Sequence, residues 1–291
     1  MTYPLAGRPV PRIGYGLRRL ASRTAELGET AAIGVLHHAY DLGIRHFDTA
    51  EFYDAGLANH LLHAAFQGRR DEVILATKAG ARPITGGPAP MTAAQQPHEL
   101  REAVEANLKS LGTEYLDVVN LRRMDFRPGL LASGDQSVPL EDQLAELTAL
   151  RDEGKIRAIG LSHVRQNQFE AALPAGITCV QNLYYLLDRS DEPLLTACRE
   201  AEVAWVPYFP LGDGGPPFNL PKVVDDPVVL AVAADLGVTA TQVGLAWQLN
   251  HSPNTMLIAG SADPEHLAEN LAAADLDLDS ATMTRLEAVR S

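Results

Sequence analysis

Short apolar runs alternate with amphipathic segments along almost the whole chain, and this alternation restricts the possible fold more than any other feature. The runs are rich in Val, Ile and Leu, as is typical of strands that are buried on both faces. Eight runs are predicted to be strands: residues 10–15, 44–49, 73–78, 116–121, 156–161, 178–181, 204–208 and 255–259.

The segments between these runs have the periodicity of helices. Within residues 99–111, Leu100, Val104, Leu108 and Leu111 follow one another at three- and four-residue steps, so they share one helix face. Eight strands with helical crossovers predict a parallel sheet closed into a (β/α)8 TIM barrel, and a doubly wound open sheet is the structural alternative. Further helical patterns cover residues 138–150, 231–249 and 264–274.

The length of 291 residues fits one such barrel, because these domains commonly have ~250 residues. The sequence shows no linker, low-complexity tract or internal repeat, so we predict a single domain over residues 1–291. Two stretches rich in Gly, Pro or small residues, 80–96 and 211–226, are predicted to be long loops. Loops at the carboxyl ends of barrel strands build the active site, so we expect these two to form its walls.

The composition argues against several classes of function. The chain has 24 Lys and Arg against 37 Asp and Glu, a formal net charge of −13, which argues against a nucleic-acid groove. We find no run of roughly 18 apolar residues and no apolar signal segment, so we predict no membrane span and expect a cytoplasmic location. Cys179 and Cys198 lack metal-ligand spacing, so we predict two buried thiols and no metal site.

Polar residues at the ends of the second and third predicted strands indicate a catalytic centre. Asp48 lies at the end of the second strand, Tyr53 follows it, and Lys78 ends the third. In a barrel these strand ends converge on one mouth. A carboxylate fixes the ammonium, and an ammonium next to a phenol makes the phenol a better general acid for a developing alkoxide. A purely structural Asp–Lys salt bridge is the alternative interpretation.

Eight segments, taken in order, resemble the aldo-keto reductase superfamily over nearly the whole chain. They are IGYG, GIRHFDTAEFY, VILATK, LGTEYLDVVNLRRMD, GKIRAIGLSHV, CVQNLYY, WVPYFPLG and LIAGSADPEHLAENL. Within the superfamily, DVVNLRRM and VPYFPLG are most similar to the bacterial pyridoxal reductase branch, which reduces the aldehyde of vitamin B6. The resemblance implies a catalytic tetrad of Asp, Tyr, Lys and His. Asp48, Tyr53 and Lys78 match its first three members.

Arg122 stands where the superfamily usually has the tetrad His. Histidine can donate a hydrogen bond and transfer a proton, whereas a guanidinium is always charged and only donates. We therefore predict that Arg122 orients and polarises the substrate carbonyl and that Tyr53 alone supplies the proton. The resemblance to the pyridoxal reductase branch extends to this arginine, which argues against an inactive site.

The resemblance also implies a nicotinamide cofactor. Ser162, His163 and Gln181 match positions that bind the carboxamide, with His163 in place of the usual Asn. Tyr208 matches the aromatic residue that stacks on the nicotinamide. The residues that match the pyrophosphate and adenosine positions are Leu211, Gly212, Gly260, Ser261, His266, Glu269 and Asn270.

The grip on the 2′-phosphate of NADPH departs from the superfamily pattern. Lys and Arg usually hold this phosphate, but Gly260 and His266 stand at those positions. Ser261, His266 and backbone N–H groups at the helix start remain as donors to a phosphate. We predict NADPH as the cofactor, with NADH as the alternative.

The leading interpretation is an enzyme that reduces a small-molecule carbonyl with NADPH. Pyridoxal is the first expected substrate, and small aromatic aldehydes or ketones come second. The alternative is an NADP-binding regulatory protein of the same fold with weak turnover. Arg122 in place of His favours this alternative, whereas the matching Asp48, Tyr53 and Lys78 count against it. We expect a monomer or a small homo-oligomer.

Overall fold

The computed structural model describes residues 1–84, 91–215 and 218–289. Its centre is an eight-stranded sheet whose strands fall on the eight predicted runs. These strands are β3 (Ile13–Gly16), β4 (His46–Asp48), β5 (Ile74–Ala79), β8 (Leu116–Arg122), β9 (Ile156–Ser162), β10 (Ile177–Gln181), β11 (Ala204–Trp205) and β12 (Leu257–Ile258).

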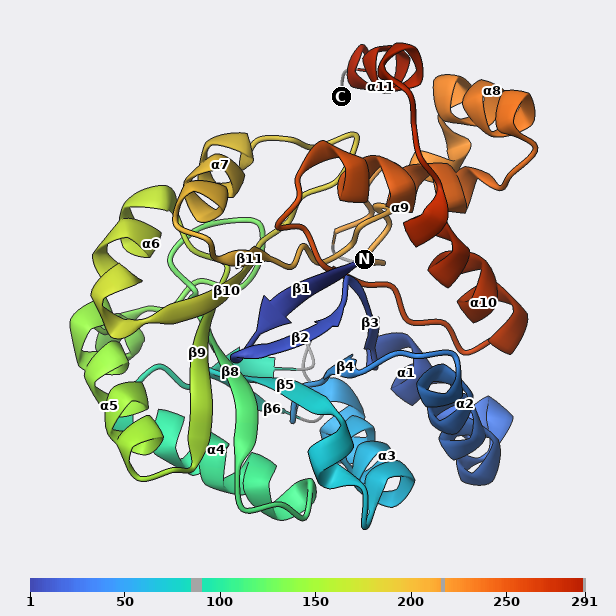
Figure 1. Ribbon diagram of the computed structural model, residues 1–291. Coiled ribbons are helices and arrows are strands. Elements are labelled where there is room, and N and C mark those ends of the chain that lie inside the picture. The colour runs from blue at the N-terminus through green and yellow to red at the C-terminus, as the bar shows by residue number, and fades with distance from the viewer. Residues whose placement is uncertain (85–90, 216–217, 290–291) are drawn as a thin grey trace.

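The sheet is parallel and closes on itself. Its strand order is β11-β10-β9-β8-β5-β4-β3-β12. The two outer strands meet at a parallel bridge between Trp205 and Thr255. The backbone N–H of Trp205 also donates to the carbonyl of Asn254 over 2.9 Å, and the backbone carbonyl of Trp205 accepts the N–H of Met256 over 2.7 Å. The sheet is therefore the predicted (β/α)8 barrel rather than an open doubly wound sheet (Figure 1).

A hairpin at the N-terminus was not predicted. Strands β1 (Thr2–Leu5) and β2 (Arg8–Pro11) pair antiparallel and cross the barrel opening in Figure 1. Leu5 and Val10 pack against barrel side chains such as Val118. The prediction of one strand over residues 10–15 was therefore too long, because Val10 is apolar and buried but belongs to the hairpin.

Helices surround the barrel (Figure 1). The predicted helices at 99–111, 138–150 and 264–274 are confirmed, but 231–249 is two helices. Gly237 adopts a left-handed φ of 67° and ends the first, and the Thr239 side chain caps the second. The helices are α1 (Arg18–Leu27), α2 (Glu29–Asp41), α3 (Leu57–Phe66), α4 (Pro97–Ser110), α5 (Leu140–Asp152), α6 (Gln166–Ala172), α7 (Glu192–Glu200), α8 (Pro227–Leu236), α9 (Ala240–His251), α10 (Pro264–Ala272) and α11 (Ser280–Glu287).

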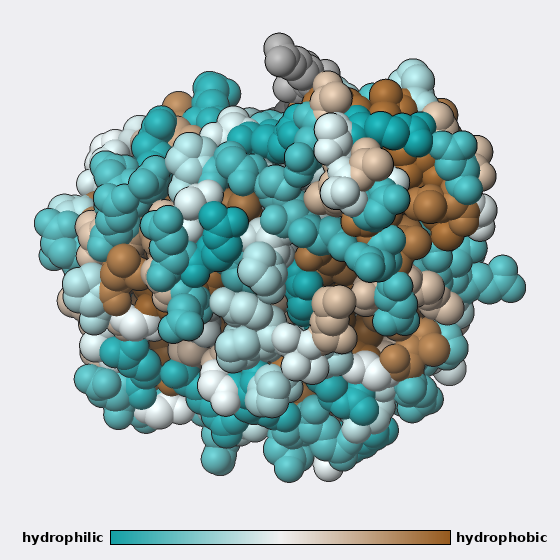
Figure 2. All heavy atoms as spheres, turned by 45° about the horizontal axis from the view of Figure 1, so that its top comes forward, coloured by the Kyte–Doolittle hydropathy of each residue, from teal (hydrophilic) through white to brown (hydrophobic). Residues whose placement is uncertain are grey.

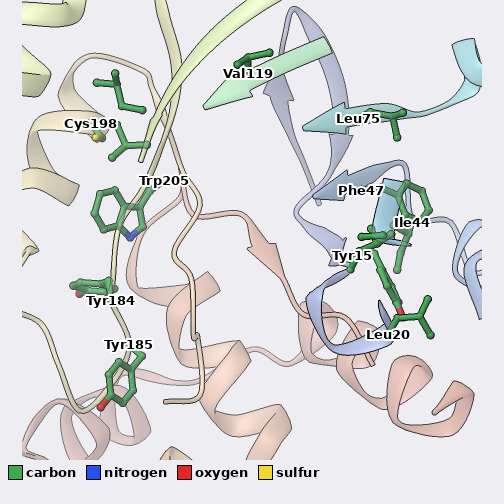
Figure 3. Close-up of a cluster of buried hydrophobic side chains, with 14 of the residues drawn as sticks. Tyr15, Leu20, Ile44, Phe47, Leu75, Val119, Tyr184, Tyr185, Cys198 and Trp205 are labelled. Atoms are coloured by element: carbon green, nitrogen blue, oxygen red, sulfur yellow. The ribbon is translucent and has the colours of Figure 1, made fainter. Parts of the chain in front are cut away.

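The largest apolar layer lies between the strands and the surrounding helices. Both predicted thiols are buried, Cys198 in this layer and Cys179 inside the barrel. Burial raises the pKa of Cys179 to about 12, so this thiol stays protonated. Figure 3 shows two groups within the layer, one with Tyr15, Leu20, Ile44 and Phe47 and another with Tyr184, Tyr185, Cys198 and Trp205.

Both predicted long loops contain ordered structure. Within 80–96, strands β6 (Ala81–Pro83) and β7 (Met91–Ala93) form an antiparallel hairpin, and residues 85–90 lie outside the described residues. Within 211–226, Asp213 and Leu220 form an antiparallel bridge, and residues 216–217 lie outside the described residues. The prediction of a long loop over 80–96 thus missed the short β6–β7 pairing, because backbone pairing there is not signalled by the Gly- and Pro-rich composition.

The surface is mixed in character. The face in Figure 2 is mainly hydrophilic, with a group of apolar residues at its upper right.

Over the described parts of the chain, no single helix is long and apolar enough to cross a membrane, and only the bent pair of α8 and α9 passes by length and composition. The same residues contain no cluster of three or more His, Cys, Asp or Glu suited to a metal ion.

Candidate active site

Asp48 and Lys78 form a buried ion pair at the carboxyl ends of two neighbouring strands. Lys78 Nζ lies 2.6 Å from Asp48 Oδ1 and 3.0 Å from the carbonyl oxygen of Thr49. Burial by itself would lower the pKa of Lys78, but Asp48 and then Tyr53 outweigh it and raise the pKa above its usual value. Lys78 is therefore a fixed cation at the barrel mouth.

Tyr53 reaches this pair from the turn that follows β4. The backbone is left-handed at Asp54 (φ 47°), Ala55 (φ 52°) and Gly56 (φ 88°). Two consecutive non-glycine residues in this region store strain, typically about 1–3 kcal/mol each. The turn places the ring of Tyr53 with its centroid 5.1 Å from Lys78 Nζ. The three residues predicted from the strand ends thus lie together.

Gln181, at the end of β10, contacts the other side of the same carboxylate. Its Nε2 donates to Asp48 Oδ2 over 2.7 Å. Its Oε1 is buried and has no hydrogen-bond partner among the residues that the structure describes. A buried amide oxygen that lacks a donor is costly, so the site suits a ligand with an N–H group. A nicotinamide carboxamide provides such a group, and Gln181 therefore fits the predicted cofactor.

Arg122 lies on the same inner face of the barrel as Lys78, one step closer to the mouth. Lys78 pairs with Asn120 in the sheet register, and Arg122 is two residues further along β8. Its Nη1 donates to Ser162 Oγ over 3.3 Å, and its Cζ lies 5.9 Å from the centroid of the Tyr208 ring.

The guanidinium of Arg122 is only partly satisfied. The residue is 9% exposed, and its buried Nε has no acceptor among the described residues. A buried donor on a cation that lacks a partner costs free energy. An oxygen of a bound ligand at this position would satisfy it.

His163 bonds inside the protein rather than toward open space. Its Nε2 lies 2.9 Å from the carbonyl of Phe126, and its Nδ1 lies 3.1 Å from the hydroxyl of Tyr208. A carbonyl only accepts, so we assign the proton to Nε2 and the Tyr208 hydroxyl as donor to Nδ1. Burial lowers the pKa of His163 to about 4, so the ring is neutral. The predicted carboxamide contact would require His163 to give up one of these bonds.

Two glycines at predicted cofactor positions lie where backbone segments approach closely: Gly212, predicted at the pyrophosphate, and Gly260, predicted at the adenosine half. A side chain at Gly212 would collide with the Pro221 carbonyl, and one at Gly260 would collide with the Gly16 carbonyl. Both positions therefore require glycine. Leu211 is partly buried and packs against the apolar core.

The predicted adenosine positions follow β12 and enter α10. Ser261 Oγ accepts the N–H of Asp263 over 3.1 Å, and His266 is exposed, with Nδ1 3.8 Å from Asp263 Oδ2. Asn270 is buried and donates to a backbone carbonyl over 3.1 Å, and Glu269 is exposed. His266 is thus the predicted residue that is free to approach a phosphate from solvent.

Two contributors to the site were not predicted. Phe126 stacks on His163 with ring centroids 4.0 Å apart. Arg18, at the start of α1, lies across the loop after β11, with Nη1 3.4 Å from the Gly214 carbonyl and Cζ 5.6 Å from the Phe209 ring. No local sequence pattern signals either contact, because 37 residues separate Phe126 from His163 and 196 separate Arg18 from Gly214.

A model of the aldo/keto reductase family matches residues 12–291. The chain belongs to the aldo/keto reductase family. It is therefore an oxidoreductase that acts on carbonyl groups, and the resemblance noted in the sequence is confirmed.

Relatives and solved structures agree with this membership. Pyridoxine 4-dehydrogenase of Escherichia coli is 38% identical over 296 aligned positions, covering 99% of this chain and 98% of that protein. An oxidoreductase of Schizosaccharomyces pombe is 31% identical, covering 96% of this chain and 86% of its own length. An aldo-keto reductase of Klebsiella pneumoniae in complex with NADPH superposes with a TM-score of 0.80 at 26% identity, covering 99% of this chain and 94% of that one.

Proposed function

We propose that this aldo/keto reductase uses NADPH to reduce an aldehyde, and that its first substrate is pyridoxal, which becomes pyridoxine. The observation that carries the proposal is the buried, incompletely bonded guanidinium of Arg122 next to the buried Asp48–Lys78 pair. The similarity to a protein named pyridoxine 4-dehydrogenase supports the choice of substrate. The solved structures that hold NADPH or NADP support the choice of cofactor.

Tyr53 is the proton donor in this proposal. As the carbonyl carbon is reduced, negative charge develops on the carbonyl oxygen, and the phenol transfers its proton to that oxygen. Lys78 remains charged and stabilises the phenolate that is left, and Asp48 holds Lys78 in place. The hydride that reaches the carbonyl carbon is the chemistry that NADPH supplies when bound. The aldehyde thus gains a hydride and a proton and leaves as a primary alcohol.

Arg122 gives the preference for pyridoxal. The aldehyde of pyridoxal lies beside a ring hydroxyl that ionises to a phenolate, so the substrate presents two oxygens side by side. A guanidinium has several N–H donors in one plane and can contact both oxygens at once. The free Nε of Arg122 supplies one donor that no protein acceptor uses among the described residues. A plain aldehyde offers only one of the two oxygens.

The experiment follows NADPH absorbance at 340 nm with pyridoxal, salicylaldehyde and benzaldehyde. Salicylaldehyde retains the hydroxyl beside the aldehyde but lacks the pyridine nitrogen, and benzaldehyde lacks both. We expect repeated turnover, with kcat/KM for pyridoxal and salicylaldehyde above that for benzaldehyde. A value for benzaldehyde equal to or above that for pyridoxal would contradict the substrate. Oxidation of no more than one NADPH per chain would instead support the regulatory alternative.

A further inference from the structure

Four polar side chains are fully buried between the barrel and two of its helices, behind the Asp48–Lys78 pair. Thr49 and Thr77 are each adjacent in the chain to one member of that pair. Asn59 lies on α3 and Asn107 on α4. None of the four is more than 1% exposed. We call these four residues the buried amide–hydroxyl network.

Hydrogen bonds join the network into a continuous chain between the two strands. Thr49 Oγ1 donates to Asn59 Oδ1 over 2.8 Å, and Asn59 Nδ2 donates to Asn107 Oδ1 over 2.9 Å. Thr77 Oγ1 donates to the same Asn107 oxygen over 2.6 Å. These hydrogen bonds connect Thr49, directly after β4, through α3 and α4 to Thr77 in β5. The residues next to Asp48 and Lys78 are therefore fixed relative to each other.

Asn59 also contacts the turn that carries Tyr53. Its Nδ2 lies 2.6 Å from Glu51 Oε2, and Ser110 Oγ donates to the same oxygen over 2.8 Å. Glu51 precedes Tyr53 by two residues and stands at the start of the strained turn. Asn59 therefore links the network through its side chain to the phenol-bearing turn.

Packing alone does not explain these residue types. The preceding outward-facing residues of the same strands, Phe47 and Leu75, are apolar and pack against helices in the same layer. Polar side chains in such a layer are tolerated only when their hydrogen bonds are complete, and a complete network fixes a single arrangement. The change from apolar to polar residues occurs at Thr49 and Thr77, where the catalytic pair lies on the adjacent residues.

We propose that Asn59 and Asn107, together with Thr49 and Thr77, are positioning residues for carbonyl reduction. They touch neither substrate nor cofactor and act by holding Asp48, Lys78 and the Tyr53 turn in one relative geometry. This inference rests on the proposed roles of those three residues. It does not depend on pyridoxal as the substrate, so any aldehyde that the enzyme turns over can be used to test it.

The first test compares Thr77→Val with Thr77→Ser. Valine keeps the shape of threonine and removes the hydroxyl, whereas serine keeps the hydroxyl and removes a methyl group. We expect Thr77→Val to lower kcat by about 2- to 10-fold, the effect of one ordinary hydrogen bond, with KM for NADPH unchanged. Thr77→Ser should stay closer to the wild type. Equal kcat in all three proteins, or a larger loss in Thr77→Ser than in Thr77→Val, would overturn the proposal in favour of simple packing.

The second test replaces Asn59 with Leu and uses Asn254→Leu as the matched control. Asn254 is 1% exposed and donates to the Val203 carbonyl over 2.9 Å. It lies just before β12, at the end of the barrel opposite the mouth. kcat is referred to the concentration of NADPH-binding sites, so that loss of folded protein is not counted. We expect Asn59→Leu to lower this kcat and Asn254→Leu to leave it unchanged. An equal loss in both variants would overturn the proposal.

Failure of the inference is distinguishable from failure of the proposed function. Tyr53→Phe measured beside these variants reports on the function alone. A fully active Tyr53→Phe would overturn the catalytic assignment. An inactive Tyr53→Phe with unchanged Thr77 and Asn59 variants would overturn only the positioning proposal.

Discussion

Gln181 donates a hydrogen bond to Oδ2 of Asp48 over 2.7 Å, while Lys78 lies 2.6 Å from the other oxygen of the same carboxylate. Gln181 and Asp48 are 133 residues apart in the chain and meet inside the barrel. The carboxylate is therefore fixed on both oxygens. The opposite end of the Gln181 amide keeps a buried acceptor for a ligand.

Gln181→Met removes both of these interactions at similar side-chain length. A hydrogen bond to a charged group contributes about 1.5–3 kcal/mol, so the free energy of unfolding should fall by an amount of that order. The affinity for NADPH should fall as well, because the carboxamide loses its acceptor. Urea unfolding and fluorescence titration with NADPH measure the two effects. Unchanged values in both would contradict the role given to Gln181.

Arg122 distinguishes pyridoxal from a plain aldehyde in this account. Arg122→His should lower kcat/KM for pyridoxal by roughly 10- to 150-fold, which corresponds to the loss of one charge-assisted contact of about 1.5–3 kcal/mol. The loss with benzaldehyde should be smaller, because benzaldehyde has no phenolate to contact. Arg122→Met should be more impaired, because no donor then polarises the carbonyl. A His variant that equals the wild type on pyridoxal would contradict the assignment.

His266 is expected to favour NADPH over NADH only modestly. It is exposed and lies 3.8 Å from the Asp263 carboxylate, which competes with a phosphate for it. His266→Ala should weaken NADPH binding by about 2- to 10-fold, the range for one hydrogen bond at a solvated site. NADH binding should not change, because NADH has no 2′-phosphate. Equal effects on the two dissociation constants, measured by titration, would argue against this contact.

The barrel and the meeting of Asp48, Tyr53 and Lys78 were predictable because their signals are local. Strands buried on both faces give short Val-, Ile- and Leu-rich runs, and parallel strands bring their carboxyl ends together. Asp48 and Lys78 stand at two of those ends, so their meeting followed from the register of β4 and β5. Tyr53 was predicted at the same mouth because it follows Asp48 by five residues, but the left-handed turn that delivers it was not predicted, since that turn has no glycine before Gly56.

Contacts between distant segments were not predictable in the same way. The bonds of His163 to Phe126 and Tyr208 depend on how two loops meet above the barrel. The buried amide–hydroxyl network consists of Thr and Asn, which also occur at ordinary surface positions. Only the structure shows that Asn59 on α3 and Asn107 on α4 lie within hydrogen-bond distance of each other. The N-terminal hairpin escaped prediction because its apolar residues merge with those of the first barrel strand.

His251 makes stability depend on pH. Its Nε2 lies 3.0 Å from Glu192 on α7, and its Nδ1 lies 3.3 Å from Glu287 on α11. Burial by itself would lower the pKa of His251, but these two carboxylates outweigh it and raise the pKa above its usual value. A pKa that is higher in the folded state means that protonation of His251 stabilises the folded state. This stabilisation is fully present below the unfolded pKa of about 6.5 and is lost as pH rises through the folded pKa.

The difference in unfolding free energy between wild type and His251→Gln should therefore be larger near pH ~6 than near pH ~8.5. Urea unfolding at the two pH values measures it. Glu287→Gln serves as the control, because it removes one of the two carboxylates that face His251. When His251→Gln is made in the Glu287→Gln protein, its effect on the unfolding free energy should depend less on pH. A difference that is the same at both pH values would contradict the ion-pair role of His251.

The most direct test of the central claim is the turnover of Tyr53→Phe with NADPH and pyridoxal, followed at 340 nm beside the wild type. Phenylalanine keeps the ring next to Lys78 and removes the only proton donor in the proposed reaction. We predict that kcat falls by about 10²- to 10⁴-fold, the range for loss of general acid catalysis. The dissociation constant for NADPH should stay within about twofold of the wild-type value, because the phenol makes no predicted contact with the cofactor. Turnover close to that of the wild type would contradict reduction at the Asp48, Tyr53, Lys78 and Arg122 site.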